Sequence, residues 1–134
     1  MKRLPEYILR CFRSDFTKTL TYEELKFLSQ MKRSFEKKEK INRVTNNFLS
    51  FVKEMWPEFI EGRHHKEIAD KFDKIAQGKI KRLIINMPPR HTKSEFASFL
   101  LPAWMVGRKP DLKIIQTTHT TELAIRFGRK AKTL

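Results

Sequence analysis

The chain has 134 residues, 40% of them hydrophobic, and is therefore long enough to bury one modest core. Its 29 lysines and arginines against 15 acidic residues leave a net charge of +14, which favours a polyanionic partner, nucleic acid before an anionic membrane. A basic fragment separated from acidic regions is the other explanation of this charge. The single cysteine, Cys11, excludes an internal disulfide, and no apolar run is long enough to span a bilayer.

Helices are predicted along the first part of the chain. A capping box at Thr21–Glu24 opens a helix that we expect to end within the charged run Lys37–Lys40. A short amphipathic helix follows over Phe48–Trp56. The next helix is predicted over His65–Gln77, where the apolar residues fall on one face and Gly78 follows as the C-cap. The apolar stripes of these helices are interpreted as core or docking surface, without a chemical role.

The stretch Arg82–Ser94, RLIINMPPRHTKS, has the order of a phosphate-binding P-loop. Its apolar run Leu83–Ile85 predicts a strand buried on both faces, which the two prolines then break. Lys93 and Ser94 start a new helical pattern, where backbone N–H groups and the helix dipole favour phosphate. In this interpretation Lys93 contacts the β- and γ-phosphates and Ser94 gives its hydroxyl to Mg²⁺.

The loop departs from the glycine pattern G-x-x-x-x-G-K-[ST], because Met87 and Thr92 stand where the glycines are expected. On the loop residues alone, a solvated first helical turn is therefore an equally simple explanation of Lys93 and Ser94.

The order of elements after the loop predicts an α/β fold. We expect Pro102 to kink or end the helix that starts at Lys93, then a second buried strand over Lys113–Thr118. Thr120 or Thr121 can cap a last helix. Strands that alternate with helices predict a parallel sheet, and two strands are too few to finish one. The chain is therefore predicted to be the front portion of a larger α/β domain.

Several blocks of the sequence, in this order, are similar to one family: GRHHKEIAD, KIKRLIINMPPRHTKSEFAS, LPAWMVGRKPD and KIIQTTHTTELAIRFGR. Through them the segment Trp56–Arg129 resembles the amino-terminal ATPase region of the large terminase subunit of tailed bacteriophages. The resemblance implies an ATP-driven motor that packages viral DNA into a procapsid. It also implies a P-loop fold of the additional-strand type, followed in the family by a metal-dependent endonuclease domain.

The resemblance divides the chain into a helical amino-terminal extension, residues 1–45, and the front part of the ATPase domain, residues 46–134. The pattern of residues 1–18 is ambiguous but permits a short helix after Pro5. Implied cofactors are ATP and Mg²⁺. Implied partners are double-stranded DNA, the portal protein and the small terminase subunit, in an oligomeric ring within the host cytoplasm and without a membrane.

The same resemblance assigns roles to the loop residues. Lys93 and Arg90 are the catalytic candidates, with Arg90 acting on the transferring phosphoryl group; a plain phosphate or backbone contact is the alternative for Arg90. Ser94 is the magnesium ligand. His64 and His65 are placed beside the adenine, and a metal site at this pair is disfavoured because no further ligands have suitable spacing. The predicted ATP-binding set is Pro89, Arg90, His91, Thr92, Lys93, Ser94 and His65.

Acidic catalytic groups are not recognisable after the loop. Only Glu95, Asp111 and Glu122 follow Lys93, and none stands at the end of an apolar run. We therefore expect weak nucleotide binding at best and no ATP hydrolysis by this chain alone. Two other functions stay open: a basic DNA-binding module with a vestigial loop, and another P-loop motor such as a helicase.

Overall fold

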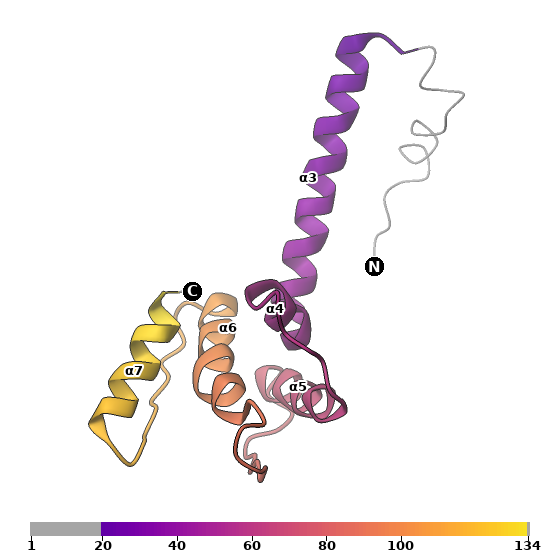
Figure 1. The fold of residues 1–134 in the computed structure, drawn as a ribbon. Helices are drawn as coiled ribbons and strands as arrows, with labels where there is room; N and C mark the ends of the chain where they lie inside the picture. Colours follow the sequence, from indigo (N-terminus) through magenta and orange to yellow (C-terminus); the bar gives the residue numbers. More distant parts are fainter. Residues whose placement is uncertain (1–19, 134) are drawn as a thin grey trace. The chain divides into compact units, whose positions relative to one another are not determined.

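The computed structural model describes residues 20–133, and the regular structure within them is entirely helical (Figure 1). The chain separates into two units, residues 1–42 and residues 43–134. The predicted short helix after Pro5 and the cysteine Cys11 lie outside the described residues.

Helix α3, Tyr22–Asn46, begins at the predicted capping box. The Thr21 backbone N–H donates to Glu24 Oε2 at 2.8 Å, and the Glu24 N–H donates to Thr21 Oγ1 at 3.4 Å, so this prediction is confirmed. The predicted end was wrong, because α3 continues through the charged run to Asn46. That run has no Gly or Pro, and its acidic and basic residues stand at helical spacing. No helix within residues 20–133 is both long and apolar enough to cross a membrane.

The core of the second unit is built by α4, Phe48–Met55, and α5, Arg63–Ala76, together with the helix that follows the loop. Both helices were predicted, and the structure confirms them. Phe48 is fully buried and meets Phe72 edge-to-face, with ring centroids 5.0 Å apart. The buried residues of this core are Phe48, Val52, Ala69, Phe72, Phe96, Leu100 and Trp104.

Asp73 of α5 fixes the start of α4. Its carboxylate accepts the Phe48 backbone N–H at 2.8 Å and the Asn47 side-chain amide at 3.1 Å, while Asn47 Oδ1 accepts the Ser50 N–H at 2.8 Å. Burial raises the pKa of Asp73, and the hydrogen bond from Phe48 opposes that rise. Two helices are therefore joined through the capping of one of them.

Helix α5 ends as predicted at Gly78, whose φ of 76° is a left-handed conformation that glycine adopts without steric cost. The Gly78 N–H donates to Ile75 O at 2.8 Å and the Lys79 N–H to Lys74 O at 2.9 Å. This pair of hydrogen bonds is the Schellman motif, and it directs the chain away from the helix toward the loop.

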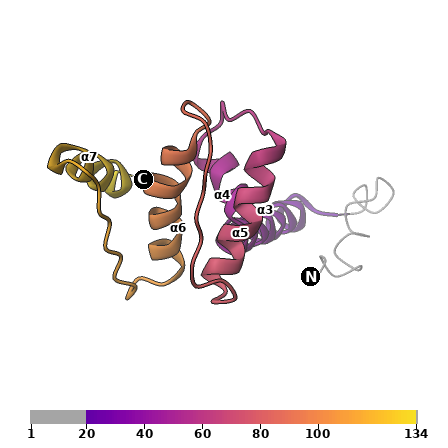
Figure 2. The ribbon, with the colours of Figure 1, turned by 90° about the horizontal axis from the view of Figure 1, so that it is seen from below.

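The α/β fold predicted from the sequence is contradicted, because residues 20–133 contain no strand or sheet. The predicted strands, within Arg82–Asn86 and over Lys113–Thr118, are extended segments. Figure 2 shows the first between α5 and α6, and the second between α6 and α7. A ladder needs a neighbouring strand, and a helix lies where each segment would find one. Their apolar residues are not buried on both faces either: Ile84 and Ile115 are 94% and 91% exposed.

The helix after the loop does not end at Pro102. A π-helical segment, η1 at Glu95–Leu100, leads directly into α6, Leu101–Arg108, with the proline in the first turn of α6. Proline has no N–H, so it cannot donate to the carbonyl four residues earlier, that of Ser98. Gln116 Nε2 donates to Ser98 O at 3.0 Å instead. The second extended segment therefore supplies a hydrogen bond that the helix cannot make for itself.

Replacing Gln116 by leucine is expected to lower the free energy of unfolding by about 1 kcal/mol, because Ser98 O loses this donor. Urea unfolding followed by circular dichroism measures the change. Exposed Lys113, on the same segment, provides the control Lys113→Leu, which leaves the donor in place. Equal stability of parent and Gln116→Leu would show that water replaces the amide at no cost.

The last helix, α7, spans Thr121–Lys132. The side chain of Thr120 accepts the Leu123 N–H at 3.4 Å, which confirms one of the two predicted caps. Helix α7 lies beside η1 and α6, so it borders the element that begins at the loop.

Candidate functional site

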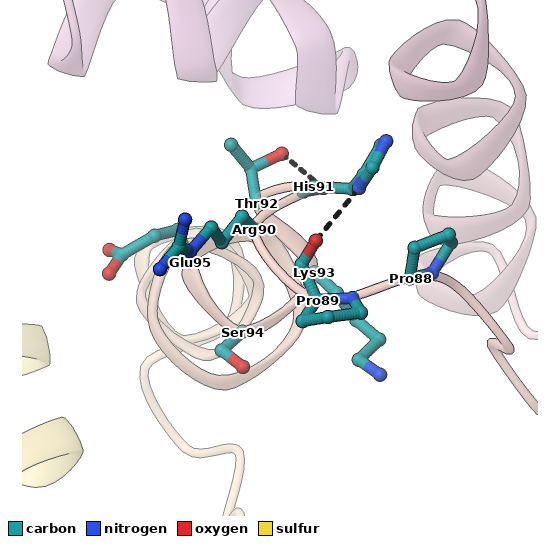
Figure 3. Close-up of a pocket in the computed structure, with 8 residues that line it drawn as sticks. All are labelled: Pro88, Pro89, Arg90, His91, Thr92, Lys93, Ser94 and Glu95. Carbon is teal, nitrogen blue, oxygen red and sulfur yellow. Dashed lines mark hydrogen bonds between the residues drawn. The ribbon is translucent and has the colours of Figure 1, made fainter.

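The residues Pro88–Glu95, called the loop from here on, line a pocket of about 510 Å³ (Figure 3). The chain becomes helical at Lys93, immediately after the bends at His91 and Thr92. Because the Phe96 N–H donates to Thr92 O at 3.0 Å, Thr92 is the residue from which the helix starts. The preceding N–H groups, of residues 93–95, are those that a helix cannot satisfy internally.

Two loop residues have left-handed backbone conformations, Arg90 with φ 65° and Thr92 with φ 56°. Thr92 stands where the P-loop pattern has its second glycine, and glycine is the residue that adopts such a φ freely. A β-branched residue there is unfavourable by about 1–2 kcal/mol. Its neighbours must therefore hold Thr92 in place.

Lys93 and Ser94 lie on the opposite side of the loop from His91 and Thr92 (Figure 3). Lys93 is partly buried, and its Nζ reaches Met87 O at only 3.4 Å, a long hydrogen bond. Ser94 is exposed, and its side chain makes no capping hydrogen bond. An ammonium group and a hydroxyl are therefore available on the open side of the helix start.

The one carboxylate among the pocket residues, that of Glu95, is paired with a cation of α7. Lys130 Nζ lies 2.5 Å from Glu95 Oε2 and also 4.7 Å from the centre of the Phe99 ring. This pairing offsets the only negative charge beside the positive Arg90 and Lys93. The local electrostatics therefore favour an anion in the pocket.

His65 lies on the inner side of the loop and is only 6% exposed. Its Nδ1 accepts the Gly62 backbone N–H at 2.9 Å, and its Nε2 lies 2.7 Å from Thr92 Oγ1. Burial lowers the pKa of His65 and the nearby His64 lowers it further, while Glu61 raises it. Both ring nitrogens of His65 are thus engaged within the protein.

The other histidines lie at the edge of the same cluster. The His64 ring is 3.8 Å from the His65 ring and 5.8 Å from the His91 ring, measured between centroids. His91 Nδ1 contacts Pro89 O at 2.9 Å. Within residues 20–133 no group of three or more His, Cys, Asp or Glu side chains is arranged to hold a metal ion.

The structure thus brings His65 and the loop residues of the predicted ATP-binding set into one place. Sequence reasoning did not identify Lys130 or Gly62 as parts of this site. A Cβ atom on Gly62 would lie 2.9 Å from His64 Cε1, so the small residue leaves room for the histidine pair. The signal for Gly62 was a capping-box spacing to His65, hidden because glycine and histidine replace the usual residues.

No protein-family model, curated protein or solved structure matches this chain.

Proposed function

We propose that the loop binds the phosphates of ATP, and that the chain is the ATP-binding part of a DNA-packaging motor of the large terminase type. One observation carries the proposal most directly. Thr92 takes a glycine-like conformation, and a helix starts at the next residue with Lys93 and Ser94 on the side away from His65. The sequence blocks that resemble the terminase ATPase region support the motor, independently of this geometry.

The donors around the pocket fit a magnesium-bound polyphosphate. Helix N–H groups, the Lys93 ammonium and the Arg90 guanidinium are all donors, as a phosphate requires. The Ser94 hydroxyl is the kind of single oxygen ligand that Mg²⁺ takes from a protein when phosphates and waters supply the others. When bound, the metal would neutralise part of the phosphate charge. Among these groups, Lys93 holds the phosphates, Arg90 reaches them from the loop, and Ser94 orients the metal.

Thermal unfolding with and without Mg-ATP tests this function, because a ligand that binds only the folded state must stabilise it. At a ligand concentration one hundred times Kd, the expected gain is about 2.7 kcal/mol. Lys93→Ala is expected to remove most of this gain, and Ser94→Ala to remove its dependence on Mg²⁺. Lys79→Ala is the control, since Lys79 is exposed and distant from the loop in sequence.

Inorganic tripolyphosphate separates phosphate recognition from nucleoside recognition. Stabilisation by both compounds would place the binding energy in the loop, whereas stabilisation by ATP alone would require contacts to the base. Equal shifts in the parent and in Lys93→Ala would refute the assigned role of Lys93.

A basic DNA-binding module is the second candidate, and α7 provides its structural basis. Arg126 and Arg129 are exposed on that helix and line a further concavity of about 400 Å³ with Glu122 and Ile125. Together with the net charge of +14, these cations suit a phosphodiester backbone. The two candidates are compatible, because a packaging motor must contact DNA as well as nucleotide.

A further inference from the structure

We propose that His65, in its neutral form, is a positioning residue that holds Thr92 in the left-handed conformation and so sets the geometry of the loop, and that protonation of His65 releases the loop. The hydrogen bonds that join Gly62, His65, Thr92 and His91 are called the latch below.

The direction of every hydrogen bond in the latch is determined. The Gly62 N–H can only donate, so the His65 Nδ1 that it contacts at 2.9 Å must be unprotonated. The neutral ring then carries its proton on Nε2, which donates to Thr92 Oγ1 at 2.7 Å. The Thr92 hydroxyl in turn donates to His91 O at 2.7 Å. Each group fills one role, and the roles agree from both ends.

The latch acts on the residue that most needs it. Thr92 is β-branched and has φ 56°, so its own preference opposes the loop conformation. The hydroxyl that His65 contacts belongs to this residue. Losing the contact therefore removes the restraint immediately before Lys93 and Ser94, the groups on which phosphate binding is proposed to depend.

Protonation of His65 is incompatible with the latch. A proton on Nδ1 would face the Gly62 N–H, so a donor would meet a donor. The ring also packs against Phe59 and Phe96, with centroids 4.8 Å and 5.1 Å away, and these rings solvate a charge poorly.

The charged and titratable groups that face His65 add to this effect. His64 on α5 and His91 on the loop disfavour a positive charge, and both could become positive themselves. Glu61 favours the charge, but its carboxylate already pairs with Lys53 and with Lys66, the latter at 3.1 Å. The balance lowers the pKa of His65 below 6.5.

The sign of the pH dependence follows from this direction. A histidine with a lowered pKa in the folded state binds fewer protons there than in the unfolded chain. The latch therefore contributes its full stability above pH 6.5. That contribution is lost as the pH falls below 6.5 and through the pKa of folded His65.

Substitutions can separate the latch from the helix cap. His65→Asn keeps an acceptor near the Gly62 N–H but is too short to reach Thr92. His65→Gln keeps a donor at the distance of Nε2 and cannot become charged. Thr92→Val removes only the hydroxyl and preserves the β-branched shape, while Thr92→Ser keeps the hydroxyl. The exposed His119, changed to Gln, controls for the loss of one histidine.

Amide hydrogen exchange of the full chain, without ligand, measures the latch directly. In the parent we expect exchange at Lys93 and Ser94 to become roughly tenfold faster, beyond its intrinsic pH dependence, as His65 is protonated. Thr92→Val and His65→Asn should show the fast exchange at every pH. Thr92→Ser should restore the parental transition, and His65→Gln should give slow exchange without one.

Thr92→Val also protects the test against misfolding, since it leaves the His65 ring and the helix cap intact. Parental exchange and an unchanged pH transition in Thr92→Val would overturn the proposal, as would a transition that persists in His65→Gln. The latch itself is measured without nucleotide, and only its consequence for ATP rests on the proposed function. Nucleotide stabilisation that is absent while the latch variants behave as expected would therefore refute the proposed function alone.

Discussion

Changing Phe48 to alanine is expected to lower the free energy of unfolding by about 3–5 kcal/mol, the largest effect of any substitution considered for this chain. Phe48 is fully buried, and its ring meets Phe72, Phe96 and Trp104 at centroid distances of 5.0, 5.5 and 5.4 Å. These rings come from α5, η1 and α6, so truncation leaves a cavity where all of these elements meet α4. The remaining rings cannot fill it without leaving their edge-to-face arrangement.

Urea unfolding of the parent and of Phe48→Ala measures this loss. Phe27→Ala removes the same side chain from a position that is 61% exposed on α3, and it should change the stability by less than about 0.5 kcal/mol. A similar cost for the two substitutions would show that Phe48 is not central to the core.

The second large effect concerns DNA binding. If the chain neutralises six to ten phosphates, its affinity for double-stranded DNA should fall by about 10³–10⁵ between 50 and 200 mM salt. Fluorescence anisotropy with a labelled duplex measures the slope. Reversing the charge of Arg126 and Arg129 together should reduce that slope by about two contacts, since both are exposed on α7.

The control reverses Lys37 and Lys38 on α3, which removes the same charge from the other unit. Equal slopes for the two double variants would show that only net charge matters and that α7 is not a specific contact surface. Repeating the titration with Mg-ATP distinguishes the two candidate functions. A steep salt dependence that nucleotide does not change would favour the DNA-binding module over the motor.

The helices could be predicted because their signals are local. The capping box at Thr21, the glycine at position 78 and the Thr120 cap each act within one turn of chain, so a short stretch of sequence contains the whole interaction. The end of α3 was missed for a related reason. Its charged run contains no stop signal, and a run of charge was given more weight than the absence of Gly and Pro.

The strands could not be predicted reliably because a strand is defined by its neighbour. The apolar runs around Ile84 and Ile115 satisfy the composition of buried strands, yet both side chains are more than nine-tenths exposed. Extended backbone was correctly indicated, but the sheet was an inference about partners that residues 20–133 do not contain.

The candidate site was partly visible in the sequence because the loop is contiguous. Its residues were found together as one run, and the resemblance added His65. The contacts that shape it join distant positions: 27 residues separate His65 from Thr92, and 35 separate Glu95 from Lys130. No spacing rule predicts such pairs. The left-handed φ of Thr92 was likewise concealed, because the sequence places threonine where a glycine would have announced it.

The π-helical segment between the loop and α6 has a consequence for chain length. Phe96, Leu100 and Trp104 are all buried at steps of four residues, which is more than one α-helical turn of about 3.6 residues and less than one π-helical turn. The wider turns at Glu95–Leu100 compensate for the overshoot of the α-helical ones and keep the buried line straight. A relative of this protein with one residue fewer in that segment could be α-helical throughout while its Lys-Ser pair and its tryptophan kept their places. Single-residue insertions and deletions at this point should therefore be tolerated where the same changes in α5 would turn core residues toward solvent.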